Sequence, residues 1–224
     1  MSTVHGGQGN IVTSGLVLNV NAANPRSYIN SINTWYDLSG NNNNGTLLNG
    51  PSFSTSGSGC IVFDGTNDYT SYNSSINWAL SSSSTVSVWS NSTAGNGYII
   101  NFEKGGWLGW YFTATGTFLY CGQAGADQTT SFGSISYGTW YHLTAVIDRV
   151  NSLFKTYKNG SFVAQTTITQ PPISYSSNLF FGARGGSPDN FFNGKIANTQ
   201  IYNRALSDSE IQQNYNATRA RFGI

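Results

Sequence analysis

Short apolar runs recur along most of the chain, separated by polar stretches rich in Gly, Asn and Ser. Within the runs, apolar and small polar residues often alternate, as in Val86-Ser87-Val88, which is the period of a strand with one face toward a core. We predict strands at residues 16–20, 60–63, 85–89, 98–102, 108–113, 117–121, 140–148, 153–157, 161–168, 179–181 and 196–202. Many short strands at even spacing predict an all-β fold, an antiparallel two-sheet jelly-roll sandwich.

One short helix is predicted at the C-terminal end, over residues 208–215. Ser207 and Glu210 have the spacing of a capping box, and Leu206 with Ile211 fits the hydrophobic staple that accompanies it. The polar stretch that follows is expected to contain the end of the helix.

The first residues differ from the rest, because Val4, Ile11 and Val12 are isolated among Gly and small polar residues. We therefore divide the chain into an extended N-terminal arm over residues 1–14, a sandwich over 15–204, and a C-terminal helix and tail over 205–224. So few apolar residues cannot order an arm by burial in its own chain. We predict that these three residues bind a partner surface by strand addition. The alternative is an arm that lies along its own sandwich.

Composition excludes several classes of function. Of the 224 residues, 8% are charged and 14% aromatic, and the formal net charge is +1 without any Lys/Arg run. Disorder requires few aromatics and high net charge, and nucleic-acid binding requires a basic face, so we expect neither. No apolar stretch has the length of a membrane span, and no secretory signal is recognisable at the N-terminus. Cys60 and Cys121 are expected to be two buried free thiols, with a single bridge as the alternative.

Several motifs resemble the laminin-G-like (concanavalin A-like) jelly-roll family, in matching order from about residue 15 to residue 215. They are Gly15-Leu16-Val17-Leu18, Trp35-Tyr36-Asp37-Leu38-Ser39-Gly40, Phe63-Asp64-Gly65-Thr66-Asn67-Asp68-Tyr69, Trp140-Tyr141-His142-Leu143 and the closing Gly194 to Ser207 segment. The resemblance implies two packed antiparallel sheets, one of them concave, with rim loops that can bind sugars or proteins. The Trp-Tyr-Asp-Leu-Ser-Gly loop and the Arg-Ala-Leu-Ser ending are similar to domains carried on tailed-phage virion proteins.

The closing segment departs from the family pattern in a way that bears on metal binding. Ala197-Asn198 stands where the family usually has an Asp-Glu pair, which removes two anionic ligands. Calcium prefers several carboxylate or carbonyl oxygens, and only Asp64, Asp68, Asp189 and Asn190 could still supply them. Asp64 and Asp68 are better explained as turn residues that bind backbone amides. We expect a metal-free protein without a cofactor.

Catalytic chemistry is not expected. Glycoside hydrolysis requires two positioned carboxylates, but Glu210 is explained as a helix cap, and Glu103 stands alone. A hydrolytic triad requires a histidine near a nucleophile; His5 lies in the arm, and His142 is interpreted as a framework residue of a strand.

Sugar binding has one candidate platform. Trp107 and Trp110, with Asn96 and Tyr111 nearby, could stack on a sugar ring and hydrogen bond to it. Alternation places Trp107 and Trp110 on opposite faces of a strand, so one of the two is expected to be a core residue.

Our first hypothesis is a non-enzymatic virion protein of a tailed phage that decorates or cements the capsid. It would assemble in the host cytoplasm, bind capsid protein and identical subunits as a homotrimer, and attach to the capsid surface through its arm. The alternative is a carbohydrate-binding, lectin-like module of a phage tail fibre, whose partner is a surface glycan. The chain lacks the long shaft of a fibre, which favours the first hypothesis. A glycan-degrading enzyme is kept as a third hypothesis for testing.

Overall fold

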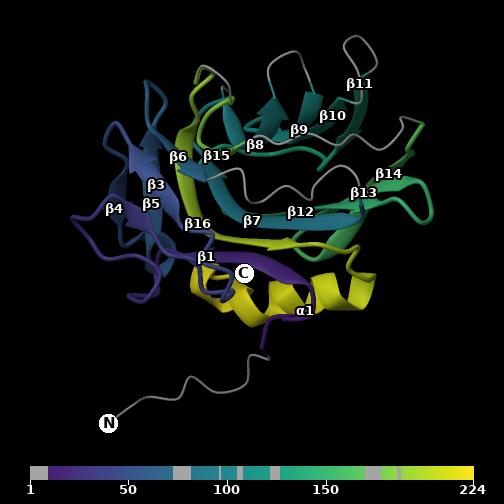
Figure 1. Cartoon of the computed structure of the whole chain (residues 1–224), viewed down its shortest axis with the longest axis horizontal. Helices are drawn as coiled ribbons and strands as arrows, with labels where there is room; N and C mark the ends of the chain where they lie inside the picture. Colours follow the sequence, from purple (N-terminus) through teal and green to yellow (C-terminus); the bar gives the residue numbers. More distant parts are fainter. Residues whose placement is uncertain are drawn as a thin grey trace.

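The computed structural model describes residues 10–72, 82–95, 97–104, 108–121, 127–169, 178–185 and 188–224, which form a sandwich of two antiparallel sheets (Figure 1). The all-β prediction is confirmed. The first sheet has the spatial order β14 (Ser161–Thr167), β13 (Leu153–Lys158), β12 (Tyr141–Asp148), β7 (Ser84–Ser92), β16 (Asn193–Tyr202), β5 (Cys60–Asp64) and β4 (Ser52–Ser54), and β1 (Leu16–Asn21) also pairs with β16. The second has the order β11 (Asp127–Ser131), β10 (Thr117–Cys121), β9 (Leu108–Thr113), β8 (Tyr98–Lys104), β15 (Leu179–Phe181), β6 (Tyr69–Tyr72), β3 (Gly45–Leu48) and β2 (Thr34–Trp35).

The main hydrophobic core lies between the two sheets. Alternation along each strand sends every second side chain inward, so Val86 and Val88 of β7 and Phe181 of β15 enter this core, together with Trp35 and Phe112. Full burial of one such side chain stabilises a fold by about 1.5–3 kcal/mol. The strands predicted from alternation therefore owe most of their stability to contacts across the sandwich.

The C-terminal helix α1 (Asp208–Thr218) covers the outer face of the first sheet, as Figure 1 shows along β1, β7, β12 and β16. Its capping box is formed by Ser207 and Glu210, as predicted, and the helix ends within the predicted stretch. The short 3-10 helix η2 (Arg219–Phe222) continues it, and a second one, η1 (Ser56–Ser58), precedes β5. Trp89 of β7 donates from Nε1 to Thr218 Oγ1 at 2.8 Å. All nine residues of β7 are buried because both of its faces are covered.

Strand β16 is the long central strand of the first sheet and carries a bulge where the family motif departs from its usual pattern. Residues 193–196 pair with β5, residues 198–202 pair with β1, and the register on β7 shifts between Ile196 and Asn198. A bulge leaves an extra residue in one strand and bends it locally. Ala197 packs beside Trp89, and Asn198 Nδ2 donates to the carbonyl of Val20 at 2.8 Å.

Five short strands were not predicted from the sequence: β2, β3, β4, β6 and β11. Their sequences contain few apolar residues; β11, for example, is Asp-Gln-Thr-Thr-Ser. Backbone hydrogen bonds to neighbouring strands hold them in place, and β2, β3 and β6 also bury Trp35, Leu47 and Tyr72 in the core. Cys60 is buried and free, in line with the expectation for this thiol, while the side chain of Cys121 lies outside the description.

Val12 is the residue of the predicted arm that the structure places most clearly. Its side chain is buried with Val146, Tyr202 and Ile211, a cluster formed entirely within one chain. Its backbone N–H donates to Asn214 Oδ1 at 2.8 Å. This end of the arm therefore follows the alternative, in which the arm lies along its own sandwich. Ile11 is half-buried and Val4 lies outside the described residues, so a partner-binding role of the arm stays a prediction.

Candidate functional site

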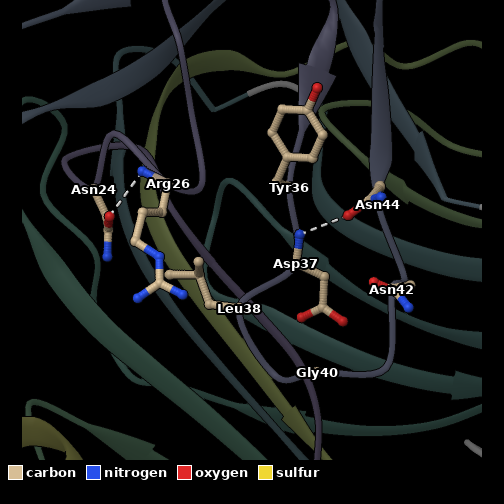
Figure 2. A pocket seen from close by; sticks show the side chains of 8 residues that line it. All are labelled: Asn24, Arg26, Tyr36, Asp37, Leu38, Gly40, Asn42 and Asn44. Atoms are coloured by element: carbon tan, nitrogen blue, oxygen red, sulfur yellow. Dashed lines mark hydrogen bonds between the residues drawn. The ribbon is translucent and has the colours of Figure 1, made fainter.

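A pocket of ≈ 600 Å³ lies between the turn that follows β1 and the loop that joins β2 to β3. We call it the β2–β3 pocket. It is lined by Asn24, Arg26, Tyr36, Asp37, Leu38, Gly40, Asn42 and Asn44. Figure 2 shows Asn24 and Arg26 on one side, Leu38 between the walls, and Tyr36, Asp37, Asn42 and Asn44 on the other side. The sequence motif Trp-Tyr-Asp-Leu-Ser-Gly thus forms one wall of a cavity.

The carboxylate of Asp37 holds the loop of this pocket in shape. Its Oδ1 accepts from the backbone amides of Asn19 at 2.9 Å and Ser39 at 2.8 Å. Its Oδ2 accepts from Ser39 Oγ at 2.7 Å and from the amide of Asn43 at 3.1 Å. The amide of Asp37 in turn donates to Asn44 Oδ1 at 2.9 Å. Four bonds to one carboxylate fix the backbone, so the pocket is formed before any ligand arrives.

The opposite wall is fixed by Asn24 and Ser27. The backbone amide of Arg26 donates to Asn24 Oδ1 at 2.9 Å, an Asx turn. Ser27 Oγ donates to the carbonyl of Tyr36 at 2.6 Å, and it accepts from the amide of Asn21 at 3.0 Å. The amide of Tyr36 donates to the carbonyl of Ser27 at 2.6 Å. These bonds join the two walls of the pocket, although Ser27 and Tyr36 lie about ten residues apart in the sequence.

The groups that face the pocket are an aromatic ring, a guanidinium and several carboxamides. Tyr36 is 36% exposed, the side chains of Arg26 and Asn42 are exposed, and Leu38 is half-buried. An exposed aromatic ring beside amide donors can stack on a flat apolar face of a ligand while the amides bind its hydroxyl groups. The arrangement is that of a binding site with fixed walls.

The predicted sugar platform is not assembled among the residues that the structure describes. Asn96 and Trp107 lie outside them, and only the backbone of Trp110 is described, in β9. Tyr111 is 5% exposed, and its ring centroid lies 4.5 Å from that of Tyr98. Tyr111 therefore packs within the sheet instead of offering an open face, and the sugar-binding role of the other three residues stays a prediction.

The sequence of residues 41–44, Asn-Asn-Asn-Asn, predicts a turn, since Asn tolerates positive φ, but it points to no ligand. Within this run Asn42 adopts a positive φ of +58°, and the preceding Gly40 has a φ of +92°. The feature of the sequence that could have indicated a binding site is the run of Asn residues at 41–44 close to Tyr36. The contribution of Arg26 could not be inferred from the sequence, since it depends on contacts between separate segments.

The calcium candidates are engaged in local structure. Asp64 Oδ1 accepts from the amide of Thr66 at 2.7 Å, and this bond holds the pKa of Asp64 below its usual value. Asp68 Oδ2 accepts from the amide of Asp64 at 3.1 Å, while burial raises the pKa of Asp68. The turn interpretation of both residues is confirmed. Asp189 forms an ion pair with Arg184 at 2.9 Å.

The described part of the chain shows neither a cluster of metal ligands nor a helix that could span a membrane. There, no three His, Cys, Asp or Glu residues come together as a metal site would require. Asn190, the fourth candidate ligand, donates from Nδ2 to Asp189 Oδ1 at 3.0 Å. Of the helices in these residues, none combines the length and apolar character needed to cross a membrane.

The candidate catalytic residues are also part of the framework. His142 is buried beside the rings of Trp89 and Tyr215, and burial lowers its pKa to about 3. Glu210 binds Arg204 and the backbone of Ser207, and the bond to Arg204 is the main cause that lowers the Glu210 pKa to about 2. The side chain of Glu103 lies outside the description. His142 and Glu210 are thus a core residue and a helix cap.

The sandwich with a pocket among its loops defines a lectin-like β-sandwich domain. The chain belongs to the concanavalin A-like lectin/glucanases superfamily, whose Laminin_G_3 family matches residues 64–212, more than half of the 224 residues. The predicted family resemblance is confirmed. The residues that line the β2–β3 pocket lie N-terminal to the residues that the family model matches.

Solved structures similar to this chain include binding domains of clostridial toxins. That of Paraclostridial Mosquitocidal Protein 1 has a TM-score of 0.72 and 21% identity, over 91% of this chain and 52% of that chain. The binding domain of botulinum neurotoxin DC, solved with rat synaptotagmin II, has a TM-score of 0.72 and 16% identity, over 92% and 52%.

A botulinum neurotoxin type C structure, described by cell entry that depends on two ganglioside molecules, has a TM-score of 0.70 and 16% identity, over 91% of this chain and 51% of that chain. This chain therefore spans about half the length of these structures, and at such identities the likeness shows the fold alone. No curated protein sequence matches it.

Proposed function

We propose that this chain is a carbohydrate-binding, lectin-like domain that holds a glycan in the β2–β3 pocket. The observation that carries the proposal is a pocket with fixed walls, in which the exposed ring of Tyr36 lies among carboxamides and a guanidinium. Membership of a lectin superfamily supports it. Similar solved structures come from toxin binding domains, one of which is described by its ganglioside interaction.

We propose binding without turnover. Hydrolysis of a glycosidic bond requires an acid and a second carboxylate on either side of that bond. Asp37 is the one carboxylate among the residues that line the β2–β3 pocket, and four hydrogen bonds occupy it. No pair of acidic groups therefore faces a ligand there.

The glycan-binding hypothesis now takes precedence over capsid decoration. The similar structures described above are toxin binding domains, so a capsid location, a capsid partner and a homotrimer stay predictions without further support. Glycan binding requires none of them, and it makes direct use of the pocket.

A glycan array followed by titration calorimetry tests the proposal. Tyr36→Ala should weaken binding by about tenfold or more, since loss of a stacking ring removes on the order of 1–3 kcal/mol. Tyr137→Ala is the matched control, because Tyr137 is 53% exposed and is not among the lining residues. Equal affinity of both variants for a bound glycan would place the site elsewhere, and an array without any bound saccharide would refute the function.

A further inference from the structure

The hydrogen-bonding capacity of the β2–β3 pocket is unbalanced. A carboxamide offers an oxygen acceptor and two N–H donors. The oxygens of Asn24 and Asn44 accept from the backbone amides of Arg26 and Asp37, both at 2.9 Å. A backbone N–H can only donate, so the atom that it binds must be the oxygen of each carboxamide. The nitrogen of each carboxamide therefore stays available to a ligand. The two Nδ2 groups are left as donors.

The acidic residue of the pocket offers no acceptor either. Both oxygens of Asp37 accept two hydrogen bonds each from the loop itself. A carboxylate has about four lone-pair positions, so Asp37 is saturated. Neutral sugar hydroxyls both donate and accept, and they bind best where the site supplies acceptors as well as donors. Among the side chains that line the β2–β3 pocket, Tyr36 and Asn42 each keep an oxygen that can accept, but the donors of Arg26, Asn24 and Asn44 outnumber them.

The guanidinium of Arg26 adds a positive charge that no group of the described chain neutralises. Its side chain takes part in no hydrogen bond, ion pair or ring contact there, whereas Arg184 and Arg204 form ion pairs with Asp189 and Glu210. A guanidinium binds a carboxylate through two parallel hydrogen bonds, which makes it a specific receptor for that group.

We infer that the ligand of the β2–β3 pocket is an acidic saccharide whose carboxylate binds the guanidinium of Arg26. Its hydroxyl oxygens accept from the Nδ2 groups of Asn24 and Asn44, and its ring packs against Tyr36. The inference rests on the proposed glycan-binding function and narrows it to one class of sugar. It accounts for the surplus of donors, the saturated Asp37 and the unpaired positive charge together.

Calorimetry with lactose and its derivatives tests this inference. The probes are N-acetylneuraminyl-lactose, its methyl ester, glucuronyl-lactose, sulfated lactose and plain lactose. The charged hydrogen bonds of a carboxylate predict that the methyl ester and lactose bind at least about tenfold more weakly than the two carboxylated sugars. Added salt should weaken the carboxylated sugars more than the neutral ones.

Variants separate the inference from the proposed function. Arg26→Gln should remove the preference for carboxylated sugars, and Arg26→Lys should restore only part of it, because lysine lacks the planar fork. Lys155→Gln, which removes a charge from β13 outside the pocket, should change nothing. Equal melting temperatures of all variants confirm that each one folds.

The outcomes are distinct. Preference for carboxylated sugars that disappears with Arg26→Gln supports the inference. Equal binding of lactose and the acidic sugars, or sulfated lactose bound as tightly as the carboxylated ones, would overturn it while leaving the domain a lectin. Absence of binding to every saccharide would overturn the proposed function as well.

Discussion

The buried carboxamide of Asn214 connects the N-terminal arm to the helix and the sheet. Its Oδ1 accepts from the amide of Val12 at 2.8 Å, and its Nδ2 donates to the hydroxyl of Tyr202 at 3.0 Å. That hydroxyl donates to the carbonyl of Val12, also at 3.0 Å. Each member of this closed network thus binds the other two, and Asn214 and Tyr202 are both 0% exposed.

Asn214→Ala should destabilise the protein, because the amide of Val12 loses its buried acceptor and the hydroxyl of Tyr202 loses a donor. A buried group left unsatisfied costs about 1–3 kcal/mol, so we expect a loss of about 2–3 kcal/mol in the free energy of unfolding. In a chain of this size that corresponds to a melting temperature roughly 5–10 °C lower. Urea unfolding monitored by tryptophan fluorescence, together with differential scanning calorimetry, measures both quantities.

The neighbouring Gln213 supplies the control for this prediction. Its Nε2 also binds the arm, donating to the carbonyl of Asn10 at 2.7 Å, but at the surface. Gln213→Ala should therefore stay within about 0.5 kcal/mol of the parent. Deletion of residues 1–13 should destabilise as Asn214→Ala does, whereas deletion of residues 1–9 leaves the Val12 contacts in place. Unchanged unfolding of both Asn214→Ala and the longer deletion would show that the arm does not depend on this network.

Other predictions concern pH, metal and turnover. Burial lowers the pKa of His142 from 6.5 to about 3. Between these pH values only the unfolded state binds the extra proton, so the free energy of unfolding falls as the pH falls. His142→Leu should flatten this dependence of stability on pH in urea titrations from pH 7 to 4.5, and an unaltered dependence would contradict the lowered pKa of His142. EDTA should leave the melting temperature unchanged, since a ligand bound only to the native state raises it; a decrease of about 10 °C or more would reveal a metal. No glycosidase activity is expected with chromogenic glycosides, and hydrolysis abolished by Glu103→Gln would overturn the non-enzymatic proposal.

Local sequence determined the elements whose signals are complete within a few residues. The capping box of α1 requires only Ser207 and Glu210 at the correct spacing, and the structure contains both of its bonds. Alternation predicted β7 and β12, because a strand that faces one core must place apolar residues at every second position. The turn formed by Asp64 and Asp68 was equally predictable, since each carboxylate binds an amide within four residues.

Strands without a hydrophobic pattern were decided by their neighbours. β11 carries only Asp, Gln, Thr and Ser, and it is a strand because the backbone of β10 supplies hydrogen-bonding partners. The outer face of β7 shows the same dependence: Ser87 and Thr85 look solvent-facing in the sequence, yet both are buried. Ser87 bonds to Thr144 at 2.8 Å, and Thr85 donates to the carbonyl of Arg204 at 2.9 Å. The burial of Thr85 thus depends on the segment that leads into α1, whose Leu206 amide also donates to Thr85 Oγ1 at 2.9 Å.

The candidate site likewise belongs to the tertiary structure. The sequence indicated a turn at residues 41–44, but the pocket exists because Ser27 binds Tyr36 and because Asp37 reaches back to Asn19 in β1. Further bonds within the loops occupy the oxygens of Asp37, Asn24 and Asn44, and they leave Arg26 and two carboxamide Nδ2 groups as donors. A sequence pattern shows which polar groups are present, but not which of them form hydrogen bonds within the folded chain. That distinction decides the ligand, and it depends on contacts between separate segments of the chain.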